Sequence, residues 1–354
     1  MSRLRIAGIA AAAVGTVAAG TAAAVFAERR VVARRRTADP VASEGFGTLR
    51  SEPVTVTATD GVRLHVEVDE APDADAAGPT VVLVHGFALN LDCWHFQRAH
   101  LRGARRTVLY DQRSHGRSER SHLDHANIDQ LGHDLRAVID AVAPDGPVVL
   151  VGHSMGGMAV IALAGHHPEL FGERVVGVGL VSTTAGGLRT HRLLGRYLPD
   201  RLMSQVTSRG MALLARAPGL VDGARRSGSD IGFLVTGRFA FGGDVPPSYV
   251  EFVDEMLAET PFEVLAEFFP NFDVLDKFEA LHAFEQVPTV IICGTEDALT
   301  SIGHSRKMAS RIHGADLVEC PGAGHMVILE RAEQVNAALD RLVKEADERA
   351  RGTR

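Results

Sequence analysis

The stretch 148–160, VVLVGHSMGGMAV, places a serine among three glycines and between two apolar halves. The first half is a continuous apolar run, which predicts a short strand buried on both faces. The second half opens the apolar pattern of a helix over 155–166. Ser154 therefore stands at a strand-to-helix junction. A Gly-x-Ser-x-Gly pattern at such a junction predicts a very sharp turn, in which Gly152 and Gly156 relieve crowding because they lack a Cβ.

Such a turn would lift the Ser154 hydroxyl clear of the sheet edge, with the N-terminus of the following helix behind it. A serine hydroxyl is a weak nucleophile until a base removes its proton, and the base needs an acid to orient it. We therefore predict that Ser154 is a nucleophile. The alternative is a tight connection between strand and helix that has no chemical role.

Two later loops supply a candidate acid and a candidate base. The segment VIICGTEDALT places Asp297 shortly after a predicted strand, with the adjacent Glu296 as a substitute. Asp297 could instead be a surface turn residue or a helix cap. The segment VECPGAGHMV places His325 in a glycine-rich loop after the last predicted strand. Because the order serine, acid, histidine is kept, with each residue at a strand end, we predict a triad of Ser154, Asp297 and His325.

Two backbone N–H groups are needed to stabilise the charge that develops on a substrate oxygen. One belongs to Met155, the residue after the serine. The other is predicted at Phe87 in VHGFALN, where the pair His85-Gly86 lets the chain turn closely. Since main chain carries both roles, the side chains should matter less than the glycines. The alternative for Phe87 is an ordinary core residue.

These motifs resemble one known family. HGF, DQRSHGRS, GHSMGG, GTED and GAGH, in this order and over about residues 54–344, resemble the α/β-hydrolase superfamily in its capped branch of esterases, lipases and cofactor-free perhydrolases. The resemblance implies the same triad and the same two oxyanion-hole donors. It also implies that 111–118 buttresses the loop beside the site. Epoxide hydrolases and haloalkane dehalogenases of this fold use a carboxylate nucleophile, so Ser154 disfavours them.

The rest of the chain predicts an α/β-hydrolase fold, a mostly parallel sheet with helices on both faces. Around Asp60-Gly61, VTVTATDGVRLHVEVDE alternates apolar and polar residues, which predicts a hairpin with a two-residue turn. Further apolar runs predict buried strands at TVVLVHG, RTVLYD, RVVGVGLVST, PTVIICG and ADLVECPG. Helical periodicity is found at 93–101, 128–142, 155–166 and 330–346.

The chain is predicted to divide into four parts. Residues 54–184 and 285–354 form the hydrolase core, and 185–284 form a helical cap inserted into it. Residues 37–53, with Pro, Gly and Ser, have the composition of a linker. Residues 1–36 stand apart as a hydrophobic segment followed by arginines.

The predicted cap has its own apolar content. It shows no convincing buried strand, and it holds ten of the chain's 15 phenylalanines. Seven of these could line an acyl pocket, while the alternative is that more than half of them form the core of the cap itself: Phe233, Phe239, Phe241, Phe252, Phe262, Phe268 and Phe269. Arg189, Arg192, Arg196 and Arg201 could meet anionic headgroups, although charges at this spacing usually solvate a helix face.

Residues 6–27 carry no charge and consist mainly of Ala, Gly and Val. As a helix they would span about 33 Å, enough to cross a bilayer core of roughly 30 Å. We expect an uncleaved membrane anchor, with the catalytic domain on the cytoplasmic side because the heavier arginine flank follows the segment. The alternatives are a signal peptide cleaved after VFA, which would give a secreted protein, and a peripheral or disordered extension.

Composition excludes other classes. The net charge of −7 and the 5% share of aromatic residues argue against a nucleic-acid binder. Three cysteines form neither a disulfide framework nor a metal set. We expect a serine hydrolase that cleaves a small hydrophobic carboxylic ester and needs no metal or organic cofactor. The alternatives are perhydrolase or thioesterase activity with the same triad, and a ligand-binding protein without turnover. The sequence makes no prediction about the oligomeric state.

Overall fold

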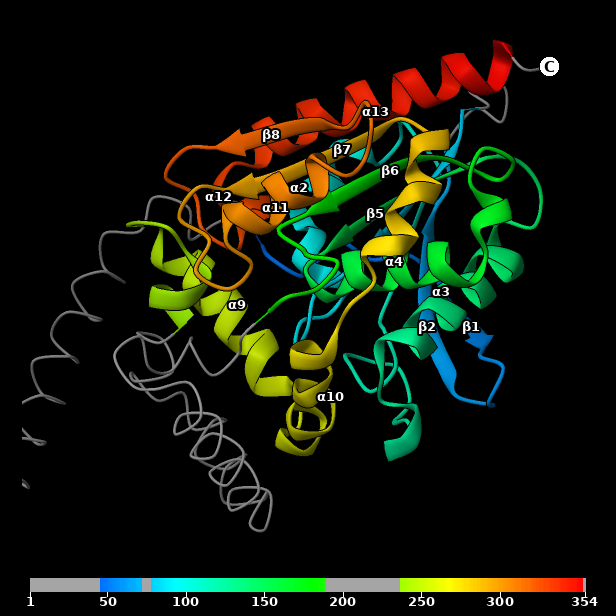
Figure 1. The fold of residues 1–354 in the computed structure, drawn as a ribbon. Coiled ribbons are helices and arrows are strands. Elements are labelled where there is room, and N and C mark those ends of the chain that lie inside the picture. Colours follow the sequence, from blue (N-terminus) through cyan, green and yellow to red (C-terminus); the bar gives the residue numbers. More distant parts are fainter. Residues whose placement is uncertain (1–44, 72–77, 189–235, 353–354) are drawn as a thin grey trace, which may run out of the picture.

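The computed structural model describes residues 45–71, 78–188 and 236–352. Its strands are β1 Pro53–Thr57, β2 Arg63–Asp69, β3 Thr80–Val84, β4 Thr107–Tyr110, β5 Val148–His153, β6 Val175–Val181, β7 Thr289–Gly294 and β8 Asp316–Cys320. They form one sheet in the order β1-β2-β4-β3-β5-β6-β7-β8 (Figure 1). Strand β2 runs antiparallel to both of its neighbours, and all pairs from β4 to β8 are parallel. The predicted α/β-hydrolase fold is therefore confirmed.

The first two strands form the predicted hairpin, but its loop has three residues and not two. The Ala58 N–H donates to the Val62 carbonyl at 2.8 Å, and the Gly61 N–H donates to the Ala58 carbonyl at 2.9 Å. Gly61 has a φ of 90°, which a residue with a Cβ rarely adopts. A turn followed by one left-handed glycine explains why Asp60-Gly61 signalled the hairpin while the loop is one residue longer.

Helices connect the strands as the periodicity predicted. The helices are η1 Leu91–Trp94, α2 His95–Leu101, η2 Leu123–His125, α3 Ile128–Val142, α4 Met155–His166, η3 Pro168–Leu170, α9 Pro247–Glu259, α10 Phe262–Val274, η4 Phe278–Gln286, α11 Ile302–Ala309, α12 Val327–Glu330 and α13 Ala332–Gly352. The predicted helix 330–346 differs, because its start is a separate short helix. The chain leaves helical geometry at Arg331, whose φ is −134° and ψ 45°.

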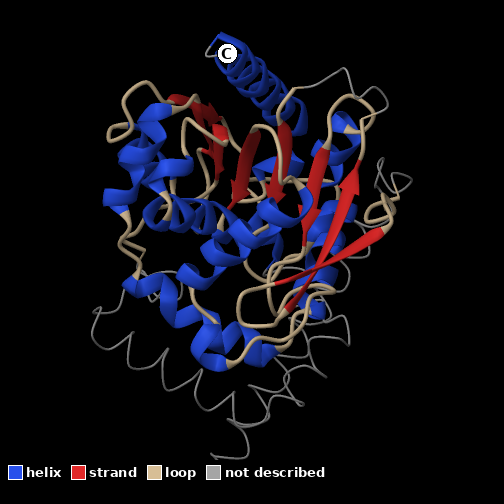
Figure 2. Cartoon of the chain, turned by 90° about the vertical axis from the view of Figure 1, so that its right-hand side faces the viewer, coloured by secondary structure: helices blue, strands red, loops and turns tan. Residues whose placement is uncertain are grey.

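The sheet separates two hydrophobic cores. Along β3, Val82 and Val84 face one core, and Val81 and Leu83 face the other. Helices α3 and α4 cover the first face, whereas α2, α12 and α13 cover the second (Figures 1 and 2). Because every residue of β3 is buried, the strand needs apolar side chains on both faces, which is why the sequence shows a continuous run and no alternation.

Helices α9 and α10 lie beyond the carboxyl ends of the parallel strands (Figure 1). Both fall in the region predicted as the cap, and the described residues of that region, 185–188 and 236–284, contain no strand. Val250 and Phe252 of α9 extend the core that contains α13, whereas Val264 and Phe268 of α10 extend the core that contains α4. The two helices therefore close the end of the sheet from its two sides.

The described part of the predicted linker packs against the body of the protein. Phe46 stacks on Phe252 of α9, with ring centroids 4.8 Å apart and planes at 16°. No helix in the described residues is long and apolar enough to cross a membrane. The predicted membrane segment, 6–27, lies outside the described residues, as do Arg189, Arg192, Arg196 and Arg201.

Candidate active site

Ser154 sits in a strained turn between β5 and α4. Its φ is 52° and its ψ −118°, a conformation that is unfavourable for a residue with a Cβ. The turn is held by main-chain hydrogen bonds: the Ser154 N–H donates to the carbonyl of Val181 at 2.9 Å, and the Gly157 N–H donates to the carbonyl of Ser154 at 3.0 Å. The predicted sharp junction is therefore present, and it fixes the serine backbone from both sides.

The glycines of the turn allow α4 to approach the sheet. A Cβ on Gly156 would lie 2.2 Å from the Val84 carbonyl oxygen and 2.6 Å from that of His85. A Cβ on Gly152 would lie 2.5 Å from the backbone of Gly156. These neighbours are backbone atoms that cannot rotate away, so both positions require glycine.

The structure brings Ser154, Asp297 and His325 together. Ser154 Oγ is 3.0 Å from His325 Nε2, and His325 Nδ1 is 3.0 and 3.1 Å from the two carboxylate oxygens of Asp297. Because a carboxylate only accepts, Nδ1 carries the imidazole proton, and Nε2 is free to accept the serine proton. The three residues thus form a continuous hydrogen-bonded chain from hydroxyl to carboxylate.

Asp297 is buried and surrounded by donors. Its Oδ1 accepts the N–H groups of Leu299 and Thr300, both at 2.9 Å, and its Oδ2 accepts the Thr300 hydroxyl at 3.0 Å. Burial by itself would raise the pKa of Asp297, but the neighbouring His325 and these donors hold that pKa well below its usual range. The carboxylate is therefore ionised. The substitute acid, Glu296, has an exposed side chain.

The loop after β3 passes directly beside the serine. A Cβ on Gly86 would come within 3.1 Å of Ser154 Cβ, so this backbone approaches as closely as glycine allows. The next residue, Phe87, packs its ring against Phe272 with centroids 5.1 Å apart. The N–H groups of Phe87 and Met155 thus belong to the two chain segments that flank Ser154, and their role as oxyanion donors stays a prediction.

Segment 111–118 supports that loop, as the resemblance implied. Asp111 Oδ1 accepts the N–H of Leu91 at 2.7 Å, and the side chain of Gln112 donates to the His85 carbonyl at 2.6 Å. The Gln112 N–H donates to His85 Nε2 at 2.8 Å. Burial lowers the pKa of His85 to about 4, so the imidazole is neutral and can accept this bond.

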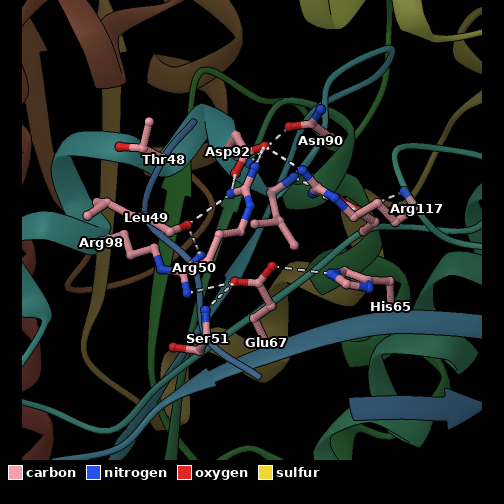
Figure 3. Close-up of polar contacts among 12 residues, drawn as sticks. Thr48, Leu49, Arg50, Ser51, His65, Glu67, Asn90, Asp92, Arg98 and Arg117 are labelled. Atoms are coloured by element: carbon pink, nitrogen blue, oxygen red, sulfur yellow. Dashed lines mark hydrogen bonds and ion pairs between the residues drawn. The ribbon is translucent and has the colours of Figure 1, made fainter. Parts of the chain in front are cut away.

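A cluster of charged residues surrounds η1, which directly follows the same loop (Figure 3). Asp92, the second residue of η1, receives the guanidinium groups of Arg50 and Arg117, the latter at 3.1 Å. The Asn90 side chain accepts the Asp92 N–H at 3.0 Å and caps η1. In the same view Arg98 lies against Glu67, 2.8 Å away. Asp92, whose side chain is buried, is thus paired with two arginines, which offsets the cost of burying its charge at the start of η1.

Ser154 and His325 open onto a cavity of about 590 Å³. Its walls come from the loop after β3, the described cap residues and the loop before α11. Most of the lining side chains are apolar, and among the described residues that line it none is Asp, Glu, Lys or Arg. A cavity of this size and composition can hold a small apolar molecule with one polar group at the serine.

The cap phenylalanines divide between the cavity and the core. Phe239 and Phe269 line the cavity, as predicted. The alternative, a place in a hydrophobic core, holds for Phe241, Phe252 and Phe268, and Phe262 is also buried. The seventh, Phe233, lies outside the described residues. Phe272, which was not singled out, does line the cavity. Phe268 and Phe269 are neighbours on α10, but Phe268 is buried in the core and Phe269 lines the cavity, so apolar character alone could not separate the two roles.

Sequence reasoning missed His153, the residue before the serine. Its ring is buried, and its Nε2 donates to the main-chain carbonyl of His325 at 3.0 Å. Burial, with the nearby His325, lowers the pKa of His153 to about 3, so its imidazole is neutral. Its position inside the glycine-serine motif was the available signal, but the partner lies 172 residues away.

Comparison with known proteins agrees with this fold. Residues 81–338 match the model of the alpha/beta hydrolase family. The chain belongs to this family. The sequence is 28% identical over 262 residues to the dihydrolipoyllysine-residue acetyltransferase component of an acetoin cleaving system from Pseudomonas putida. That alignment covers 73% of this chain and 62% of the relative, so the chain spans less than two thirds of the relative's length.

Two solved structures of this family illustrate the likeness. An esterase from Thermogutta terrifontis superimposes with a TM-score of 0.66 at 23% identity, covering 84% of this chain and all of the esterase. An enol-lactonase from Burkholderia xenovorans gives a TM-score of 0.66 at 24% identity, covering 82% of this chain and all of the lactonase. At these identities the likeness shows the fold alone.

Proposed function

We propose that this alpha/beta hydrolase is a serine esterase that cleaves small, uncharged, hydrophobic carboxylic esters. The observation that carries the proposal is the unbroken hydrogen-bonded chain from Ser154 Oγ through His325 to Asp297, which opens onto an apolar cavity. A hydroxyl bonded to an imidazole that is in turn oriented by a buried carboxylate is the arrangement that activates serine.

The chemistry is acyl transfer. Ser154 Oγ attacks the ester carbonyl carbon while its proton passes to His325 Nε2, and the N–H groups of Phe87 and Met155 receive the negative charge on oxygen. The imidazolium then protonates the departing alcohol, and the acyl group stays on Oγ. Water, deprotonated by His325, attacks the acyl carbon, releases the acid and restores the serine. Asp297 stabilises the imidazolium in both halves of the reaction.

The cavity supports an uncharged substrate. A bound carboxylate, phosphate or ammonium group would lose its hydration there and would find no oppositely charged side chain among the described lining residues. Apolar walls formed by Phe239, Phe269, Phe272 and Leu257 favour a hydrocarbon acyl or alkyl group by removing it from water.

Covalent labelling with a fluorophosphonate probe tests the proposal. The full-length protein should be labelled and should turn over a short p-nitrophenyl ester, whereas Ser154→Ala should do neither. The control is Ser310→Ala, an exposed serine whose hydroxyl donates to the Lys307 carbonyl, which should behave as wild type. Equal labelling of wild type and Ser154→Ala would refute the nucleophile.

The same assay tests which acyl acceptor and which acyl donor the enzyme prefers. Water as acceptor and an oxygen ester as donor should give the highest turnover, compared with peroxide as acceptor and with a thioester as donor. Slow release of one equivalent of product without turnover would instead indicate a ligand-binding protein.

A further inference from the structure

The loop that carries His325 is joined to the cap through one carboxylate. Glu330, the last residue of α12, accepts the N–H of Gly324 through Oε1 at 2.7 Å and the N–H of Gly242 through Oε2 at 3.0 Å. Gly324 directly precedes the histidine, and Gly242 belongs to the cap. One side chain therefore satisfies two backbone donors that lie 82 residues apart in the sequence, one in the cap and one in the histidine loop.

The two backbones touch at this point. A Cβ on Gly242 would lie 2.5 Å from the carbonyl carbon of Ala323 and 2.6 Å from the amide nitrogen of Gly324. A Cβ on Gly324 would lie 2.4 Å from the amide nitrogen of Gly242. A main-chain hydrogen bond adds to this contact, since the N–H of Met326 donates to the carbonyl of Ala240 at 2.8 Å. Both residues that flank His325 are thus held by the cap segment 240–242, directly or through Glu330.

A second part of the cap, the end of α9, reaches the loop that follows β3. Thr260, which ends α9, donates through its hydroxyl to the carbonyl of Ala88 at 3.2 Å. The Asn90 side chain donates to the Glu259 carboxylate at 3.3 Å. The cap therefore contacts the histidine loop through segment 240–242, and the loop of Phe87 through Glu259 and Thr260 at the end of α9.

We propose that Glu330 is a positioning residue. Together with Gly242 it makes the position of the base, His325, depend on the contact between the cap segment 240–242 and the histidine loop. The proposal rests on the function proposed above. In this arrangement the imidazole meets Ser154 Oγ only while segment 240–242 lies against the histidine loop. If the cap moved away at this segment, Ser154 would stay in place but His325 would move. The enzyme therefore turns over only while segment 240–242 contacts the histidine loop. The carboxylate suits this role because its two oxygens can accept from both backbones at once.

The first test adds one methyl group at Gly242, on the cap side of its contact with the histidine loop. In Gly242→Ala the new Cβ meets backbone atoms of the histidine loop, so the loop must shift. The expected result is a fall in kcat of about 10- to 100-fold, with KM for a short ester little changed, because the base is misplaced by a fraction of an ångström. The matched control is Gly243→Ala, whose Cβ would meet nothing within 4 Å and which should keep wild-type kcat.

The second test removes one hydrogen-bond acceptor of Glu330 while keeping the shape of its side chain. Glu330→Gln replaces one carboxylate oxygen by an amide group that cannot accept, so one of the two backbone N–H groups loses its partner. We expect a smaller fall in kcat in the same direction. The control is Glu333→Gln, the same change at an exposed position three residues away. In each variant kcat is expressed per active site titrated with the fluorophosphonate probe.

A spectroscopic readout separates this inference from the proposed function. The proton between His325 Nδ1 and Asp297 gives a downfield nuclear magnetic resonance signal, identified by its absence from His325→Gln. This signal should shift or broaden in Gly242→Ala and Glu330→Gln and not in the two controls. If wild type cleaves no ester, the proposed function fails, but the signal still decides the coupling.

Several outcomes would overturn the inference. The coupling is refuted if Glu330→Gln keeps both the wild-type kcat per active site and the wild-type signal. It is also refuted if the variants only lower the number of titratable sites and the thermal unfolding temperature, since that is a purely structural effect. Should Gly242→Ala fail to fold, Glu330→Gln alone decides.

Discussion

The turn of Ser154 and the loop of His325 lie 3.0 Å apart at their side chains, but they are held in different ways. Ser154 is fixed by the strand before it, the helix after it and the neighbouring strands β3 and β6, all through backbone and glycine contacts. The histidine loop also contacts the sheet: His153 of β5 donates to the His325 carbonyl, and the N–H of Glu296, just after β7, donates to the Ala323 carbonyl at 2.9 Å. In addition, it is held by the cap segment 240–242 and by Glu330. Ser154 is therefore held by the sheet and α4, whereas His325 is held by the sheet and the cap together.

The largest effect is expected where the acid orients the base. Asp297→Asn keeps the shape of the side chain but presents an amide to His325, which favours the wrong imidazole tautomer. We expect kcat to fall by about 10⁴-fold, as when the acid of a triad is replaced by its amide. Steady-state turnover of a p-nitrophenyl ester measures the change. A loss of tenfold or less would show that contacts outside Asp297 suffice to orient the base.

The control for this change lies in the adjacent position. Glu296→Gln alters the exposed substitute acid and should leave kcat unchanged. If Glu296→Gln were the more damaging of the two, the assignment of the acid would be reversed.

The second effect concerns the rigidity of the serine turn. Gly156→Ala brings a methyl group to 2.2 Å from a backbone oxygen of β3, so α4 must move away from the sheet. We expect a loss of about 3 kcal/mol or more in the free energy of unfolding, at the upper end of overpacking effects. Chemical denaturation measures it.

Gly165→Ala, in the same helix, is the matched control. Its Cβ would meet only the side chain of Ala280 at 3.4 Å, and alanine stabilises a helix by up to about 1 kcal/mol relative to glycine. Equal stability of the two variants would mean that the close approach of α4 to β3 is not a constraint on the turn.

The smallest effect is expected at His153, which links the serine turn to the loop of His325. Burial first, and His325 second, lower the pKa of His153 to about 3 from its ordinary 6.5. Below pH 6.5 the unfolded chain therefore binds a proton at this residue that the folded protein does not bind. Because of this difference, His153 lowers the free energy of unfolding as the pH falls from 6.5 towards 3, by about 1.4 kcal/mol per pH unit.

His153→Gln removes this titration while keeping an N–H donor for the His325 carbonyl. The slope of the free energy of unfolding against pH, measured between pH 6 and pH 4, should become shallower by about 1.4 kcal/mol per pH unit. The exposed His122→Gln serves as control and should leave the slope as in wild type. An unchanged slope in His153→Gln would mean that this ring is not held neutral between the two regions.

Much of the fold could be read from the chain because its elements are locally encoded. The periodicity over 128–142 and 155–166 predicted α3 and α4 with the bounds that the structure has. The apolar runs at 80–84, 107–110, 148–153, 175–181 and 289–294 became the buried strands β3 to β7, since strands covered on both faces need apolar residues at every position. Strand β8, at the edge of the sheet, is partly exposed. The hairpin loop was one residue too short in the prediction, because the same Asp-Gly pair serves turns of two and three residues.

The predicted site residues came from strand order, and their convergence is a property of the topology. Parallel strands end at one edge of the sheet, so residues after β5, β7 and β8 meet there whatever their distance in the sequence. Both interpretations of the cap phenylalanines applied, since Phe239 and Phe269 line the cavity whereas others are buried. The sequence could not sort them, because hydrophobicity does not tell whether a ring meets another side chain or a cavity.

By itself the sequence determined the sharp serine turn, the strands and helices of the core and the order of nucleophile, acid and base, since backbone sterics and hydrophobic periodicity act between near neighbours. Only the tertiary structure decided which carboxylate faces His325, which cap residues line the cavity and how Glu330 joins the cap to the histidine loop. Those contacts form between segments far apart in the chain. Their free energy depends on which surfaces the fold brings together, and no local pattern records that.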